Sequence, residues 1–224
     1  MQLIEICKQV IQDPVRRSWQ LPTEQFIHAT LDFLTYVSAS EGHLSRIAEI
    51  SYIHPLGYRK IVLWQSARRE RIRLHLWPSS VNNIVQPDVH DHYWDFRSFI
   101  LSGALRFRHF DVSRRGARYK RYSMSPVGNG AYDLMYCGTE TLMQTSEIVA
   151  SAGSEVALAC SALHSTTALC ASATLVCQSR RAQNTNTVYQ PAKHARNETH
   201  QTPQRMTAPD LRNAFEELGR LLGG

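Results

Sequence analysis

Residues 87–103 read PDVHDHYWDFRSFILSG, and this stretch decides the fold expected for the whole chain. Side chains alternate between the two faces of a β-strand, so His90 and His92, two positions apart, point to the same side. Four later residues share their parity: Trp94, Phe96, Ser98 and Ile100. The stretch therefore predicts one strand that carries two nitrogen ligands at one end and an apolar face beyond them, with a turn at Gly103.

Short apolar runs with a period of two surround this stretch. Upstream they cover residues 50–54, 59–64 and 72–77, and downstream 104–112, 119–125, 131–136, 141–150, 156–164 and 173–178. Turn residues such as Gly57 and the segment 127–130 separate them. No helix-length pattern occurs among these runs, so the sequence favours a mainly β, antiparallel barrel or jelly roll over a parallel α/β fold.

Helical patterns occupy both ends of the chain. Apolar spacing predicts a helix in residues 3–11, a second one that Thr23 caps, and a short third one before residue 50. Near the other end, Asp210 is expected to cap an amphipathic helix whose stripe is Leu211, Phe215, Leu218 and Leu222. The predicted division is therefore a helical cap (1–49), a β-barrel (50–181), a loosely ordered polar segment (182–209) and a C-terminal helix (210–224).

The composition is that of a globular protein. Of the 224 residues, 43% are hydrophobic and 20% are charged, and no apolar run reaches membrane-spanning length. The segment Met1–Lys8 lacks the pattern of a signal peptide. The five cysteines never form a CxxC pair, which favours free thiols over a disulfide framework. We therefore expect a cytoplasmic protein with no membrane partner.

The net charge of +6 and the pI near 9.2 raise the question of an anionic partner. Basic residues gather in two segments, 68–73 and 114–121, at expected hairpin ends. Solvated loops explain most of them there, and an anionic partner or ligand is the alternative. Neither end of the chain has the spacing of a helix-turn-helix, so nucleic acid is not an expected partner.

Two histidines need at least a third protein ligand to form a mononuclear metal site. His164 is the first choice because it ends the run 156–164, where the small residues Cys160 and Ala162 would share its face and leave room for a bound molecule. His109 is the alternative third ligand. The plain structural interpretation is that each histidine is a surface or hydrogen-bonded residue, and that Cys160 is a small buried side chain instead of a thiol near the metal.

The order of these residues resembles the cupin superfamily, in which a β-barrel presents histidines inward. The matching features, within residues 50–180, are His90-x-His92, Gly103 at the end of the same run, and Gly153 followed by His164. The glutamate that follows the histidine pair in most cupins is absent, and so is the Pro-x-Gly before the last histidine. The sequence is therefore more similar to three-histidine iron cupins, namely the cysteine dioxygenase type and the iron cupin domains of N-oxygenating biosynthetic enzymes.

That resemblance implies a double-stranded β-helix, or jelly roll, that holds Fe(II) at His90, His92 and His164; Zn, Ni and Mn remain open as alternatives. It also implies an oxygenase, of the dioxygenase kind, that uses O2 and a small polar or anionic substrate, in a protein that forms homodimers. The candidates for substrate contact are Arg73, His75, Arg106 and Trp94, with Tyr52, His54 and Arg108 as further candidates on the same strand faces. The plain alternatives are ordinary strand placement, solvent exposure of Arg106 and Arg108, and a barrel-core position for Trp94.

Two other classes of function fit the same residues. One is a cupin that binds or senses a small molecule without redox chemistry. The other is a Zn(II) or Ni(II) enzyme that catalyses isomerisation or hydrolysis. Metal content separates the first class from an iron oxygenase, and oxygen uptake separates the second.

Overall fold

The computed structural model describes residues 2–12, 23–55, 57–78, 87–128, 131–193 and 200–223. Within these residues the chain is mainly β, with helices towards both ends. The helices are α1 (Gln2–Gln12), α2 (Thr23–Ser38), α3 (Glu41–Ile50) and α4 (Ala208–Leu221). The strands are β1 (Tyr52–Ile53), β2 (Arg59–Gln65), β3 (Arg71–Trp77), β4 (Val89–His90), β5 (Trp94–Ser102), β6 (Ala104–Gly128), β7 (Ala131–Ser151), β8 (Glu155–Leu158), β9 (His164–Ala168), β10 (Ser172–Arg181), β11 (Thr187–Pro191), β12 (His200–Gln201) and β13 (Gln204–Arg205).

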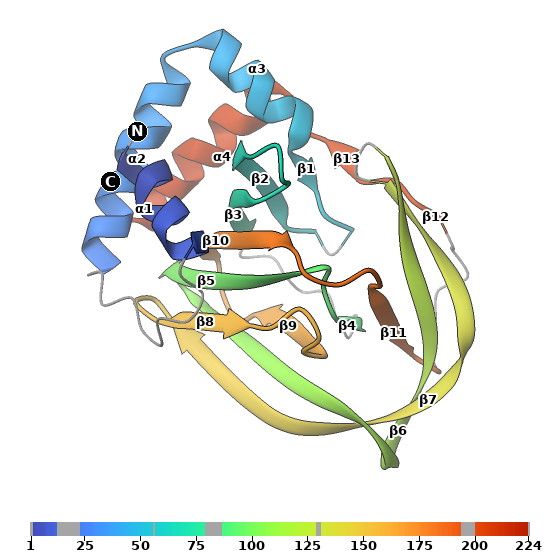
Figure 1. Ribbon diagram of the computed structural model, residues 1–224. Helices are drawn as coiled ribbons and strands as arrows, with labels where there is room; N and C mark the ends of the chain where they lie inside the picture. Colours follow the sequence, from blue (N-terminus) through green and yellow to red (C-terminus); the bar gives the residue numbers. More distant parts are fainter. Residues whose placement is uncertain are drawn as a thin grey trace.

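The strands form two antiparallel sheets. Sheet A has seven strands in the order β13-β1-β2-β3-β10-β5-β8, and sheet B has six in the order β11-β4-β9-β6-β7-β12. In Figure 1 the helices lie together on one side of sheet A, while the long hairpin β6–β7 curves around the other side. The predicted mainly β class is therefore confirmed, as a helical layer, a central sheet and a second sheet.

Strand β3 shows how sheet A serves two layers. Its even-numbered residues Ile72, Leu74 and Leu76 are at most 1% exposed and belong to the core shared with the helices. Its odd-numbered residues Arg73, His75 and Trp77 line a cavity on the opposite face. Because side chains alternate along a strand, the apolar face that binds the helices also fixes which residues face the cavity.

The helical layer packs on sheet A through one continuous core. That core contains buried residues of all four helices, such as Leu3, Phe26, Leu44 and Leu211, together with buried residues of β2, β3, β5 and β10. The three predicted N-terminal helices are confirmed. Among the described residues, no helix combines the length and the hydropathy that crossing a membrane requires.

Helix α4 begins earlier than predicted. Its N-cap is Thr207, whose hydroxyl accepts a hydrogen bond from the backbone N–H of Asp210 at 3.3 Å. The Asp210 carboxylate in turn accepts from the backbone N–H of Thr207 at 2.8 Å, so the two residues form a capping box. The prediction of Asp210 as the cap is therefore wrong by three positions, since Asp210 supplies the reciprocal half of the motif.

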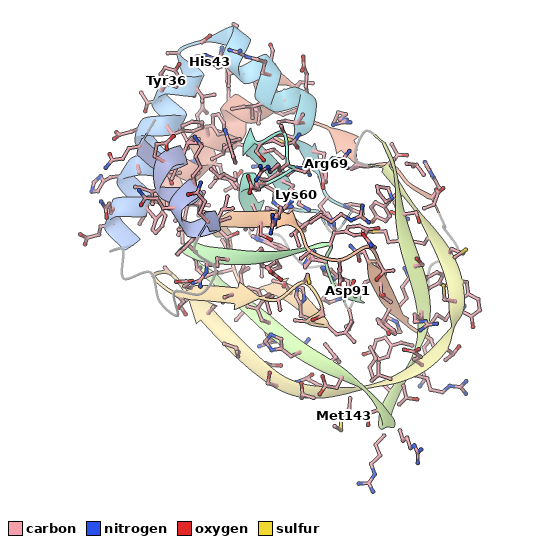
Figure 2. All side chains as sticks on the ribbon, viewed as in Figure 1. Tyr36, His43, Lys60, Arg69, Asp91 and Met143 are labelled. Carbon is pink, nitrogen blue, oxygen red and sulfur yellow. The ribbon has the colours of Figure 1, made fainter. Side chains whose placement is uncertain are left out.

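The hairpin β6–β7 is longer than predicted. Runs 104–112 and 119–125 form one strand, β6, and runs 131–136 and 141–150 form another, β7. The turn-like residues between Val112 and Ala117 form a bulge, because both of these residues pair with Leu142. Within it Gly116 has a φ of 131° and lies too close to the Leu142 carbonyl to accept a Cβ. Figure 2 shows Met143 at the outer edge of this hairpin.

Two runs predicted as single strands cross from one sheet to the other, so those predictions are wrong. Residues 87–103 divide into β4 of sheet B and β5 of sheet A, and residues 156–164 divide into β8 of sheet A and β9 of sheet B. Aspartates stabilise the crossing: Asp91 accepts from the Thr187 backbone N–H at 2.6 Å, and Asp95 from that of Cys160 at 2.7 Å. Such side-chain bonds to the backbone compete with strand pairing.

The polar segment 182–209 is not loosely ordered where the structure describes it. Strand β11 pairs with both β4 and β6, β12 pairs with β7, and β13 pairs with β1 at the edge of sheet A. In β11, Val188 and Tyr189 are buried. Residues 194–199 lie outside the described part of this segment. The segment is ordered because it pairs with neighbouring strands and buries some of its side chains. Neither property can be predicted from its polar composition.

Gly103, at the turn between β5 and β6, gives a test of this topology. Its φ is 77°, and an added Cβ would overlap the Ala171 carbonyl and the Ser172 side chain. We expect Gly103→Ala to lower the free energy of unfolding by more than about 1 kcal/mol. Chemical denaturation followed by circular dichroism measures this change.

Gly219 supplies the matched control, because it lies inside α4 with no atom within 4 Å of its built Cβ. There the same Gly→Ala change should raise the free energy of unfolding by about 0.5–1 kcal/mol. Equal effects of the two substitutions would contradict the turn conformation assigned to Gly103.

Candidate metal centre

The local topology of sheet B brings the histidines together. The first half of β6 pairs with β9, its second half pairs with β11, and the short strand β4 lies between β9 and β11. In this arrangement His90 of β4 and His164 of β9 are directly opposite each other in register. Opposite residues on antiparallel strands project to the same face, so the pairing places both imidazoles side by side.

His92 completes the group just after β4 ends. Its backbone N–H donates to the Cys160 carbonyl at 2.9 Å, and its own carbonyl accepts from Gln183 Nε2 at 2.6 Å. Cys160 therefore holds His92 through its backbone. The prediction that Cys160 and Ala162 share a strand face with His164 is wrong, because residues 159–163 lie between β8 and β9 and form no strand.

The three imidazoles converge on one point. Ring centroids are 4.7 Å apart for His90 and His164, 4.8 Å for His90 and His92, and 5.0 Å for His92 and His164. One nitrogen from each ring lies within 4.8 Å of the others, and His164 is only 1% exposed. Three nitrogen donors at this separation can bind one metal ion and leave further coordination positions open, as catalytic sites do.

Backbone carbonyls orient two of the rings. His90 Nδ1 lies 3.1 Å from the Asp88 carbonyl oxygen, and His164 Nδ1 lies 3.0 Å from that of Ala162. A carbonyl can only accept, so each Nδ1 carries the proton and each Nε2 keeps a free lone pair. This is the outer hydrogen bond that metal-binding histidines use to fix their ring and tautomer.

Burial keeps all three imidazoles neutral. It lowers the pKa of His90 and brings that of His164 to about 3, and it holds the pKa of His92 well below the ordinary value. Repulsion between the neighbouring rings lowers the pKa of His92 and His164 further. Neutral imidazole is the form that binds a metal, so near pH 7 no proton has to leave before an ion binds.

The cluster borders a cavity of about 520 Å³ between the two sheets. Aromatic rings lie against it: Phe96 is 4.9 Å and Trp94 6.0 Å from the His92 ring, and Tyr58 stacks on Trp77 at 4.0 Å. Among the described lining residues the only carboxylate is that of Asp88. The cavity therefore has aromatic rings beside the histidines and a size suited to a small molecule.

Arg73, His75 and Trp94 line this cavity, as do Tyr52 and His54. The Arg73 guanidinium, on a residue that is only 3% exposed, lies 5.6 Å from the centre of the Trp94 ring. Their role as substrate contacts stays a prediction. The expectation that the basic segment 68–73 is a solvated hairpin end is wrong for Arg71 and Arg73. Strand β3 includes both residues, and their side chains line the cavity.

Arg106, Arg108 and His109 have other partners, although His109 is opposite His164 in register. Both arginines form ion pairs with Glu147, at 3.1 and 2.8 Å, and His109 Nδ1 is 2.9 Å from the Ser146 hydroxyl. None of the three lines the cavity, whereas Leu105 and Phe107 of the same strand do. The structure therefore contradicts the predicted substrate contact of Arg106 and the alternative ligand His109. The sequence could not tell that Arg106 and Arg108 lie on the outer face of β6, nor that His109, which shares the parity of Leu105 and Phe107, lies beside Ser146 and outside the cluster.

Lys60, Arg71 and Gln178 also line the cavity, and no sequence pattern predicted them there. Lys60 is opposite His75 in register, and Gln178 is opposite Arg71. Register partners on neighbouring strands share a face, so the position of His75 and Arg71 predicts that of Lys60 and Gln178. That inference is possible only after the strand order is known, because Gln178 lies on β10, far from β3 in sequence.

Comparisons with known proteins leave the family open. No family model matches the chain, and no curated protein matches it. A solved structure, that of protein SO0799 from Shewanella oneidensis, is similar over 79% of this chain and 90% of its own, with 11% sequence identity and a TM-score of 0.27. A similarity at that level supports no argument about fold or function.

The histidine cluster predicts a stoichiometric metal site. Protein reconstituted with Fe(II) under anaerobic conditions should bind about one ion per chain, and His90→Ala, His92→Ala and His164→Ala should each lose it, because two remaining donors hold an ion poorly. Metal analysis after gel filtration measures the content. His109→Ala is the matched control, since that ring lies outside the cluster. Metal retained in the first three variants would contradict the site.

His75 predicts a pH dependence of stability for the metal-free protein. Burial and the charges of Arg73 and Lys60 hold its pKa well below the ordinary value in the folded state. Below about pH 6.5 the unfolded chain therefore binds a proton that the folded chain does not, and stability falls as the pH falls. His75→Gln should reduce that loss by up to about 1.4 kcal/mol per pH unit. Denaturation curves at several pH values measure it.

The control for this comparison is His28→Gln, on an exposed position of α2. We expect its profile to follow that of the unchanged protein. If His75→Gln loses stability towards acid as steeply as the control, His75 is not a neutral buried group.

Proposed function

We propose that this protein is an Fe(II)-dependent oxygenase of the three-histidine cupin type, acting on a small polar or anionic metabolite. The observation that carries the proposal is the convergence of three neutral imidazoles at the wall of a cavity that aromatic rings line in part, with no carboxylate among the three ligands. The residue order that resembles cupins, with His90 and His92 early and His164 late, agrees with this assignment.

The donor set fits iron. Imidazole nitrogens bind Fe(II), as they bind Zn(II), Ni(II) and Cu(II). Three donors from one side leave cis positions open, and Fe(II) bound there would supply the ability to coordinate and activate O2 beside the substrate. The carbonyl partners of His90 and His164 keep each Nε2 available for that ion.

The remaining residues of the chain would prepare the substrate. Phe96 and Trp94 lie against the His92 ring and exclude water from one side of the site. A dry surrounding strengthens electrostatic interactions and protects reactive species from side reactions. Arg73 and His75 lie on the same face of β3 and can hold an anionic group of the substrate in a fixed position.

Nitric oxide gives a test that does not require the substrate. It occupies the same open positions as O2, so anaerobic Fe(II)-loaded protein should give the electron paramagnetic resonance signal of a high-spin iron nitrosyl. His164→Ala should abolish the signal, and His109→Ala should leave it unchanged. Oxygen uptake in the presence of small acids would then identify turnover.

Three results would overturn the proposal. Iron that binds to the cluster but never reacts with nitric oxide would indicate a closed site. Protein that selects zinc or nickel over iron would favour the isomerase or hydrolase alternative. Protein that binds no metal even after reconstitution would favour a binding module without redox chemistry.

A further inference from the structure

One wall of the cavity carries more positive charge than the described residues neutralise. Lys60 of β2 and Arg71 and Arg73 of β3 all line the cavity. Among the described residues, no carboxylate lies within ion-pair distance of any of the three. Figure 2 shows Lys60 projecting towards the middle of the molecule. By contrast, a glutamate forms an ion pair with each of four other arginines, Arg97, Arg106, Arg108 and Arg121.

The pairing of β2 with β3 gathers these cations into one group. Lys60 is opposite His75, Val62 is opposite Arg73, and Gln65 is opposite Arg71. Residues two apart on one strand lie on the same face at a separation of about 6.6 Å, so Arg71, Arg73 and His75 form a row. Lys60 adds a fourth nitrogen group beside that row.

Two buried nitrogen atoms of this group have no hydrogen-bond partner. Arg73 Nε and His75 Nε2 are buried without a hydrogen bond, whereas Arg71 Nε donates to Gln65 Oε1 at 2.7 Å. A buried polar atom without a partner costs free energy, and an unpaired buried charge costs more. Burial is the main cause that lowers the pKa of Lys60 well below its usual value and that of Arg73 to about 10. Repulsion between these neighbouring cations lowers both pKa values further. An anion in the cavity would relieve both penalties.

We propose that the cavity binds a small dianion, a dicarboxylate or a phosphate monoester, whose negative charges lie against Lys60, Arg71 and Arg73. A single carboxylate would leave most of this charge uncompensated. An ammonium group would lack a carboxylate partner on this wall, so zwitterionic amino acids are poor ligands. The inference rests on the proposed function only in treating this dianion as the substrate.

The anion site lies close to the histidines. The Arg73 guanidinium is 5.6 Å from the Trp94 ring, and the Trp94 ring is 6.0 Å from that of His92. Trp94 therefore lies next to both the cations and the histidine cluster. A ligand anchored on the cations can reach the metal centre with a body of only a few atoms, which restricts the substrate to small molecules.

Ligand-induced thermal stabilisation provides the test. EDTA-treated protein is titrated at constant ionic strength with succinate, inorganic phosphate, butyrate and γ-aminobutyrate, and the melting temperature is recorded. Any ligand that binds the folded state selectively raises it. Succinate or phosphate should bind at least about tenfold more tightly than butyrate, the value of one lost charged hydrogen bond, and γ-aminobutyrate should not bind. The succinate and phosphate arms distinguish the two sources of dianion.

Variants locate the site. Arg73→Met and Lys60→Met should each weaken binding of the preferred dianion by about tenfold or more. Arg106→Gln is the matched control, because it removes one positive charge from the outer face of β6 and should leave affinity unchanged. Without ligand, Arg73→Met should melt at the same temperature or higher, since it removes an unpaired buried charge. A residue that served only the fold would lower that temperature.

The inference fails if butyrate or γ-aminobutyrate binds as tightly as the dianions, if no probe stabilises the protein, or if Arg106→Gln weakens binding as much as Arg73→Met. The outcome is independent of the metal. Because the titration uses metal-free protein, dianion binding can succeed where iron binding fails, and the reverse result is equally distinguishable.

Discussion

The candidate site depends on one cross-strand pair, His90 opposite His164. Strand β4 has only two residues, yet its pairing with β9 on one side and β11 on the other joins three distant parts of the chain. A one-residue slip in either pairing would turn an imidazole to the opposite face of the sheet. The buried Val188 and Tyr189 of β11, which pair with β4, therefore stabilise the register on which the cluster depends.

A second constraint is that sheet A is buried on both faces. The helices cover one face with an apolar core that extends through Ile72, Leu74 and Leu76. Between these residues the same strand turns Arg73 and His75 into the cavity. Apolar burial contributes about 25 cal/mol per Å², and burying an unpaired charge costs several kcal/mol, so the helical layer offsets the cost of a charged inner face. Stability and ligand chemistry are in this way assigned to alternate positions of one strand.

The sequence predicted which histidines form the site, but not the strands that carry them. The spacing of His90 and His92 and the position of His164 identified the three residues that the structure brings together. The supporting strand did not exist as predicted, because the chain changes sheets between His92 and Trp94. Crossing points of this kind depend on side-chain bonds from Asp91 and Asp95 to backbone groups that are distant in sequence. Local periodicity contains no information about such partners, and for the same reason it could not show which face of β6 is the inner one.

Both halves of the cavity favour an anion. The histidine cluster presents neutral nitrogens, so an ion bound there would keep its full positive charge, and the neighbouring wall adds Lys60, Arg71 and Arg73. A carboxylate in the ligand set would have balanced part of that charge within the protein. Its absence leaves the balance to the ligand, and positive charges fixed on buried strands act more strongly on an anion than they would in bulk water. A ligand set without a carboxylate therefore leaves positive charge at this end of the cavity that an anionic molecule would balance.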